Sequence, residues 1–402
     1  MQASRLLRAG VWAVLAAALS ACGSLGAPSL DLDSLPALVL DSGKQIPAAD
    51  VATASGVEPL LLVTPQMHDF VARFAPRETS PRARLLGLHE AVRGAGALGV
   101  GYNPAADGSA EQVFASGDAN CLSFAHLFVA LAREAGLDAR YQWLDVRPQW
   151  TRVGERLTMR VHVNVMVRMP HGEQFMVDID PLQARDIAAS RLLADREAEA
   201  LHDNNLAMVA LADGNLPVAW MHLVNALRQS PDLPLLWVNL GAIYRQTGQL
   251  EAVEWALLQA LERDSGERSA MNNLALLYDQ TGRSRERDAW LARIQRYRER
   301  NPYYLAWRGD MAGESGDWNE ALLQYRKALD LQPGDSALLA ATGIIHFKLQ
   351  QYGAAERLLQ QAIDAASLSS ERREYAAQLE RIRRGRDHGG VQASGAAGST
   401  RI

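Results

Sequence analysis

The sequence lacks the features that mark several common classes of protein. Its 402 residues carry 41 basic and 46 acidic side chains, a formal net charge of −5, so the basic surface that nucleic-acid binding requires is missing. It has no glycine-rich phosphate-binding loop and no His/Cys cluster at metal-ligand spacing. These absences argue against nucleic acid as a partner, and they predict no cofactor and no metal.

The apolar run near the N-terminus, at residues 9–21, is too short to span a bilayer. It follows a short basic stretch, as the apolar part of a secretory signal peptide does. Residues 19–23 read LSACG, which resembles the lipobox of bacterial lipoproteins. That resemblance implies a signal peptide at residues 1–21 and a lipidated Cys22 that anchors the chain in a membrane.

Cysteine is scarce, because the chain has only Cys121 besides Cys22. Gly23 and Ser24 rather than an aspartate follow Cys22, and in such lipoproteins this favours the outer membrane, with the chain facing the periplasm. The alternative is an ordinary signal peptide with a chance cysteine. If Cys22 is acylated, Cys121 has no partner within the chain, and a lone thiol in an oxidising compartment needs burial or a chemical role.

The next two regions differ in composition. Residues 22–58 are dominated by small residues, proline and aspartate without a sustained period, and we predict a tether. Residues 59–190 are predicted to form a compact domain. Its first part carries helical spacing between residues 66 and 93, and Pro76 and Pro81 break that run into two helices.

From about residue 200 the pattern is helical and repeats every 34 residues. Small residues recur where two helices must touch, and a turn glycine recurs in four of five windows, at Gly214, Gly248, Gly282 and Gly316. This resembles the tetratricopeptide repeat, a helix–turn–helix unit. The resemblance implies five repeats over residues 200–370 that bind a protein or peptide partner. We predict a capping helix at 371–384 and a disordered tail at 385–402.

A buried helix is predicted to begin at Cys121. The following segment is nearly all apolar, Asn120 is a suitable N-cap, and Gly136 is a suitable stop. The dipole and free N–H groups at a helix N-terminus favour an anion, so we expect a lowered pKa for this thiol. The same N–H groups can stabilise an oxyanion. His126, in mid-helix, is interpreted as a core or interface histidine.

Two strands joined by a turn are predicted between residues 160 and 180, from the alternation of valine with other residues. This hairpin sets His162 on the same face as Asp178 and Asp180. A cysteine nucleophile needs a base to take its proton and a carboxylate to orient that base. The two strands offer both.

A cysteine that opens a buried helix, followed by a histidine on one strand and an aspartate on the next, resembles the transglutaminase-like superfamily. The match covers roughly residues 65–185. The resemblance implies a triad with Cys121 as nucleophile, His162 as base and Asp178 as orienting acid, with Asp180 as the alternative third member. The expected fold class is an α+β papain-like/transglutaminase-like domain followed by an all-α tetratricopeptide-repeat solenoid.

The leading hypothesis is an envelope lipoprotein whose transglutaminase-like domain acts on amide bonds, by hydrolysis or by acyl transfer, while the array recruits a partner or substrate. The alternative is a non-catalytic scaffold or assembly protein that works through its repeats. A third hypothesis is a cell-wall enzyme that acts on peptidoglycan stem peptides.

Overall fold

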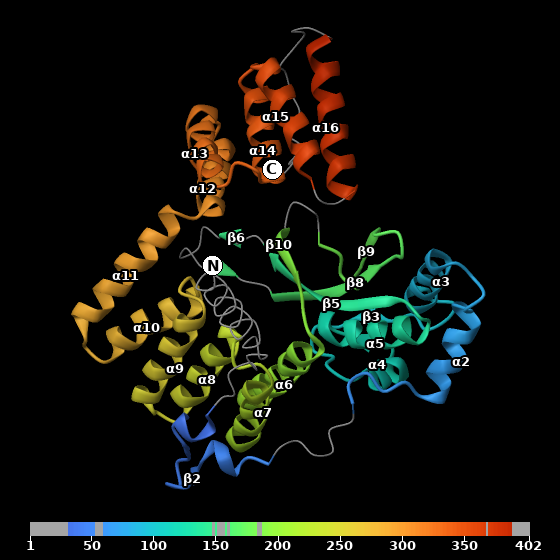
Figure 1. Ribbon diagram of the computed structural model, residues 1–402. Helices are drawn as coiled ribbons and strands as arrows, with labels where there is room; N and C mark the ends of the chain where they lie inside the picture. The colour runs from blue at the N-terminus through green and yellow to red at the C-terminus, as the bar shows by residue number, and fades with distance from the viewer. Residues whose placement is uncertain are drawn as a thin grey trace, which may run out of the picture.

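The computed structural model describes residues 31–52, 59–146, 149–150, 157–158, 161–182, 187–366 and 369–387. Cys22, the expected signal peptide and most of the expected tail lie outside the described residues. The described chain forms a small α/β domain, a long series of helices, and an N-terminal segment that lies against those helices (Figure 1). None of the described helices is long and apolar enough to cross a membrane.

The α/β domain begins with the two helices that the sequence predicts, α2 (Pro65–Phe74) and α3 (Pro81–Arg93). Each has a proline in its first turn and a hydroxyl side chain as N-cap, from Thr64 and Ser80. A loop follows, with β3 (Gly101–Tyr102), α4 (Ala110–Ser116) and β4 (Asp118–Ala119), and leads directly into α5 (Cys121–Glu134).

A four-stranded antiparallel sheet packs against α5. Its strand order is β10-β5-β8-β9. The bounds are Asp138–Val146 for β5, Val161–Arg168 for β8, Gln174–Val177 for β9 and Ile187–Leu192 for β10. Val163, Val165 and Val167 on β8 are buried in the same hydrophobic core as α5. A short pair of strands, β6 (Gln149–Trp150) and β7 (Leu157–Thr158), lies in the β5–β8 connection.

The repeat region consists of helical hairpins. From the second repeat on, the first helices begin at Pro234, Arg268, Pro302 and Ser336, which reproduces the 34-residue period. The bounds are α6 Asp195–Ala212, α7 Leu216–Gln229, α8 Pro234–Gln246, α9 Leu250–Arg263, α10 Arg268–Gln280, α11 Ser284–Glu299, α12 Pro302–Glu314, α13 Trp318–Leu331, α14 Ser336–Lys348 and α15 Tyr352–Ala365.

The turn inside each hairpin requires a left-handed residue. Gly214, Gly248, Gly282 and Gly316 take positive φ angles between 71° and 83° there, a conformation that costs glycine little. In the fifth repeat Gln350 stands at this position, with a φ of 60°, the one non-glycine residue with positive φ in the described chain. The predicted turn positions are therefore the observed ones, and the fifth turn is strained.

The last helix is longer than the sequence predicts. Helix α16 spans Ser369–Asp387, so residues 385–387, expected in a disordered tail, are helical. Arg383 forms ion pairs with Glu380, one turn earlier, and with Glu356 on α15. The pair with Glu356 and the burial of Tyr375, Leu379 and Ile382 attach the helix to the last repeat. Composition alone missed this, because the segment ends in charged and small residues.

The expected tether is wrong for residues 31–52. This segment folds into η1 (Leu32–Ser34), β1 (Leu38–Val39), β2 (Gln45–Ile46) and η2 (Ala48–Asp50) and lies against α7–α9 (Figure 1). Leu35 and Leu38 are buried in the main hydrophobic core. Side chains of the array also bind its backbone: Gln249 bonds both Val39 N and Ala37 O.

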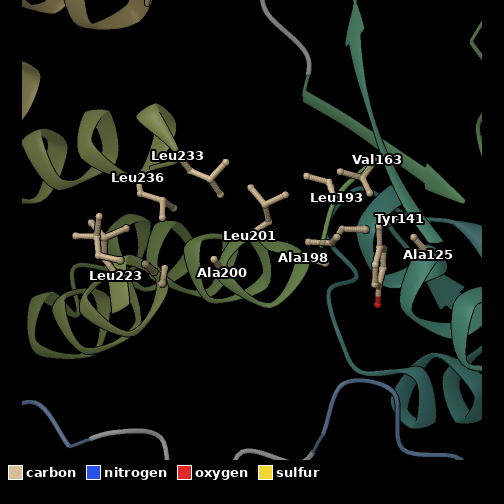
Figure 2. Packing of buried hydrophobic residues seen from close by; sticks show 14 of the residues in the cluster. Ala125, Tyr141, Val163, Leu193, Ala198, Ala200, Leu201, Leu223, Leu233 and Leu236 are labelled. Atoms are coloured by element: carbon tan, nitrogen blue, oxygen red, sulfur yellow. The ribbon is translucent and has the colours of Figure 1, made fainter. Parts of the chain in front are cut away.

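Three hydrophobic clusters divide the described chain. The largest runs without a break from the N-terminal segment through the α/β domain to α11, whereas α12–α14 and α14–α16 form two smaller clusters. Helix α6 connects the α/β domain to the repeats, because Ala198 and Leu201 pack between the sheet and the next repeat helices (Figure 2). The first repeats and the α/β domain therefore share one core.

Candidate active site

Cys121 occupies the first position of α5, as the sequence predicts. Asn120 is the N-cap, and its side chain accepts a hydrogen bond from Ser123 N at 2.8 Å. The Ser123 hydroxyl accepts in return from Asn120 N at 2.9 Å, which completes a capping box. Cys121 is partly exposed, whereas the next eleven residues of α5 are buried. The helix thus presents the thiol at the domain's edge.

His162 and Asp178 form a buried pair. Nε2 of His162 donates to Oδ2 of Asp178 at 2.6 Å, and both side chains are more than nine-tenths buried. Because Nε2 is engaged with the carboxylate, Nδ1 is the ring nitrogen that can serve a thiol. The structure thus brings together the two residues for which the sequence predicts the roles of base and orienting acid, and these roles stay predictions.

Asp180 does not take part in this pair. The register between β8 and β9 pairs Val165 with Val177, so a continued hairpin would set position 180 opposite His162. The strand ends at Val177, however, and the side chain of Asp178 reaches the histidine instead. Asp180 is exposed, and its backbone N–H donates to Oδ1 of Asp178 at 3.1 Å. The geometry therefore favours Asp178 over the alternative.

Asn164 is a site residue that the sequence did not assign. It is fully buried, and its Nδ2 donates to Oδ2 of Asp178 at 3.3 Å. The carboxylate of Asp178 thus accepts hydrogen bonds from His162, Asn164 and the backbone of Asp180. These partners fix the orientation of the carboxylate that holds the imidazole. The position of Asn164, two residues after His162 on the same strand, was a signal available in the sequence.

The thiol lies at the same corner as this pair. Its electrostatic environment includes the charge of Asp178 and the backbone of Val163, the neighbour of His162. Burial raises the pKa of Cys121, and the negative charge of Asp178 adds to this, whereas backbone hydrogen bonds at Val163 and Leu122 oppose it. The lowered pKa expected from the helix N-terminus is therefore wrong, because burial outweighs the backbone hydrogen bonds to the sulfur.

A thiol with a raised pKa keeps its proton at neutral pH. A nucleophilic role would then require transfer of the thiol proton to His162 as the sulfur attacks. The geometry suits this role, because Asp178 holds the imidazole with its proton on Nε2. No group of three or more metal-binding side chains occurs among the described residues.

His126 lies on α5, five residues after Cys121. It is fully buried, and its Nδ1 is 2.7 Å from the hydroxyl of Tyr141 on β5. Burial lowers the pKa of His126 to about 3, with a further contribution from nearby His202, so the imidazole is neutral. This agrees with the interpretation of a core or interface histidine and sets it apart from His162.

Comparison with known proteins identifies the domain. Residues 69–179 match the model of the transglutaminase-like superfamily, a span that contains Cys121, His162 and Asp178. The chain therefore carries a transglutaminase-like domain, followed by the helical repeats described above. No curated protein matches the chain.

Solved structures that resemble the chain include helical proteins. One is PilF of Pseudomonas aeruginosa, with 17% identity over 48% of this chain and 88% of that chain, at a TM-score of 0.25. Another is a tetratricopeptide repeat protein of Parabacteroides merdae, with 20% identity over 47% of this chain and 75% of that chain, at a TM-score of 0.24. A third is YrrB, a TPR protein with an unusual peptide-binding site, with 16% identity over 46% of this chain and 94% of that chain, at a TM-score of 0.24.

Proposed function

We propose that this protein is an envelope lipoprotein whose transglutaminase-like domain transfers acyl groups from an amide to Cys121 and then to water or to an amine. The single observation that supports this most is the buried pair of His162 and Asp178, 2.6 Å apart, at the corner where α5 presents its thiol. The surroundings of the thiol include the charge of Asp178 and the backbone of Val163, the neighbour of His162, which fits a nucleophile served by this pair.

The proposed reaction has two steps. Sulfur of Cys121 attacks the amide carbonyl while Nδ1 of His162 takes the thiol proton. The C–N bond then breaks, the amine leaves with that proton, and a thioester remains on Cys121. In the second step His162 takes a proton from water or an amine, which attacks the thioester and releases the thiol. Asp178 stabilises the imidazolium in both steps but stays ionised.

The second half of the proposal concerns the repeats, which we propose recruit a protein or peptide partner. The first two repeats are covered in part by the chain's own residues 31–52, so α12–α15 offer the freer surface. A photo-crosslinker in place of the exposed Leu323 on α13 tests this, with the exposed Val209 on α6 as the matched position. A discrete adduct from position 323 alone is expected, and equal yields from both would contradict the assignment.

The proposed anchor is a lipid on Cys22. If residues 35–51 stay bound to the array, the chain between Cys22 and Leu35 spans about 45 Å at most. The first repeats are then held near the membrane. We expect labelled palmitate to enter the wild-type protein and not the Cys22→Ala variant, with the label in the outer membrane fraction. Equal labelling of both proteins, or label in another fraction, would contradict this.

The enzymatic proposal is tested with p-nitrophenyl acetate as an activated acyl donor, on the chain without residues 1–22, where Cys121 is the only thiol. We expect a burst of p-nitrophenolate at about one equivalent, lost in Cys121→Ala and in His162→Ala. Release of the acetyl group is then followed with and without a primary amine. Faster release with the amine indicates a transferase, and an unchanged rate indicates a hydrolase.

A second candidate function is supported by the raised pKa of the thiol. Burial raises the pKa of Cys121, and an inert thiol would fit a scaffold that works through its repeats alone. The same burst assay separates the two. A folded wild-type protein that gives no Cys121-dependent burst is a scaffold.

A further inference from the structure

The first repeat helix is joined to the transglutaminase-like domain by polar contacts as well as by apolar packing. Arg133 of α5 donates to both carboxylate oxygens of Asp195 at the start of α6, at 2.6 and 2.8 Å. Leu201, two turns along α6, packs toward the sheet in the same cluster as Tyr141 and Val163 (Figure 2). These contacts therefore hold helix α6 against α5 and the sheet of the domain that carries Cys121.

His202 on α6 makes the most buried of these polar contacts. Its Nδ1 donates to Oδ1 of Asp107 at 3.1 Å, and each side chain is 10% exposed. Burial acts to raise the pKa of Asp107, but the interaction with His202, the hydrogen bond from Asn205 and the electrostatic effect of His126 together outweigh it and hold that pKa below its ordinary value. The ring of His202 also stands edge-to-face on His126 of α5, with centroids 5.6 Å apart.

Asp107 belongs to the loop that holds the first turn of the catalytic helix. The carbonyl of Ala106, the preceding residue, accepts a hydrogen bond from Asn120 N at 2.8 Å and another from the Ser123 hydroxyl at 2.9 Å. Asn120 and Ser123 form the capping box on either side of Cys121. A continuous chain of contacts therefore runs from the repeat array, through Asp107 and Ala106, to the turn that positions the thiol.

We propose that His202 is a positioning residue for Cys121: its hydrogen bond to Asp107 holds the Ala106 carbonyl against the first turn of α5. This inference rests on the proposed role of Cys121 as nucleophile. In this proposal the array does more than recruit a partner, because its first helix, α6, holds the loop that positions Cys121. Displacement of α6 would release the loop and misplace the sulfur.

Two amide substitutions at position 202 test this. In His202→Asn the side-chain nitrogen occupies the place of Nδ1 and keeps the donor to Asp107. In His202→Gln the nitrogen lies near the place of Nε2, so the donor is lost while size and polarity are kept. His222→Gln is the matched control, since Nδ1 of His222 donates to Asp203 at 2.9 Å in a similarly buried pair that joins α7 to α6.

Two rates are measured on the chain without residues 1–22. One is alkylation of Cys121 by iodoacetamide as a function of pH, and the other is the p-nitrophenolate burst. In His202→Gln we expect alkylation at pH 7 to rise about threefold, because a less buried thiol has a lower pKa and is easier for the reagent to reach. The burst should slow about tenfold or more, because misplacement of a reacting group by 1 Å can cost about a hundredfold.

His202→Asn and His222→Gln should behave as wild type in both assays. Because unfolding would also expose the thiol and abolish the burst, circular dichroism and the Tm of each variant are measured to show that the fold is kept. The proposal is overturned if His202→Gln keeps both wild-type rates, if His202→Asn behaves like His202→Gln, or if His222→Gln shows the same changes. A wild-type protein that alkylates but gives no burst refutes the enzymatic proposal, while the alkylation profiles of the variants still test the role of His202.

Discussion

The choice between Asp178 and Asp180 gives the sharpest prediction. In Asp178→Asn the amide that replaces the carboxylate no longer stabilises an imidazolium. When the oxygen of this amide accepts the hydrogen bond from the backbone N–H of Asp180, its NH2 group faces Nε2 of His162. The imidazole then carries its proton on Nδ1, which is the nitrogen that must accept the proton of Cys121. The distance of 2.6 Å between Nε2 and Oδ2 is typical of a strong, charge-assisted hydrogen bond.

The expected loss follows from known triads. In a Ser-His-Asp triad the same Asp-to-Asn change lowers kcat by about 10⁴-fold, or about 5.5 kcal/mol in activation free energy. We therefore expect the p-nitrophenolate burst of Asp178→Asn to slow by about 10³-fold or more. Asp180→Asn is the control, and because that side chain is exposed we expect a change of less than about threefold.

The reverse result would refute this reasoning. If Asp180→Asn abolishes the burst and Asp178→Asn leaves it, the third member is Asp180 and the strand end has been misinterpreted. Circular dichroism of both variants checks the fold. Loss of a buried, charge-assisted hydrogen bond costs about 1.5–3 kcal/mol of stability, which lowers the Tm but leaves a folded protein at 25 °C.

Three further outcomes are expected. Because burial raises the pKa of Cys121, its alkylation rate should keep rising at pH values where the alkylation rate of a free cysteine is already constant. A rate that becomes constant below pH 7 would contradict this and indicate a preformed thiolate–imidazolium pair. Gln350→Gly should raise the free energy of unfolding by about 0.5–1 kcal/mol, because it relieves a φ of 60°. Gln351→Gly, at a φ of −90°, should not raise it. Equal effects of the two substitutions in urea titrations would argue against strain at Gln350. Gly309→Ala should lower the Tm at a cost of about 2 kcal/mol or more, since its Cβ would lie 2.4 Å from the Tyr325 ring, and an unchanged Tm would contradict this close packing.

Local chemistry determined what the sequence could predict. The repeat glycines fixed the turns because a left-handed backbone favours glycine, and Gly214, Gly248, Gly282 and Gly316 all adopt it. Asn120 and the apolar run behind Cys121 fixed the start of α5 for a similar reason, since an N-cap acts within one turn.

Features that depend on distant parts of the chain were not predictable. Nothing local indicates that β9 ends at Val177, so hairpin alternation left Asp178 and Asp180 equally placed. The direction of the Cys121 pKa was missed because desolvation depends on how the whole domain buries the thiol. The pair of His202 and Asp107 joins residues 95 positions apart, which no periodicity reports.

The N-terminal segment was missed for a related reason. Its elements are two or three residues long, too short to show any period. Its position depends on side chains that lie some 200 residues away, such as Tyr244, whose hydroxyl donates to Pro36 O at 2.5 Å, and Arg228, which donates to Val51 O at 2.6 Å. A composition rich in small residues and proline therefore predicted a tether where the array holds a folded segment.

The central claim is that Cys121, assisted by His162, carries the acyl group. The most direct measurement is mass spectrometry of the chain without residues 1–22 after a short reaction with p-nitrophenyl acetate, with peptide mapping of the acetylated site. The account predicts one acetyl group on Cys121 in the wild type and none in His162→Ala under the same conditions. An unmodified Cys121, acetylation spread over lysines, or equal acetylation of Cys121 in the variant would contradict it.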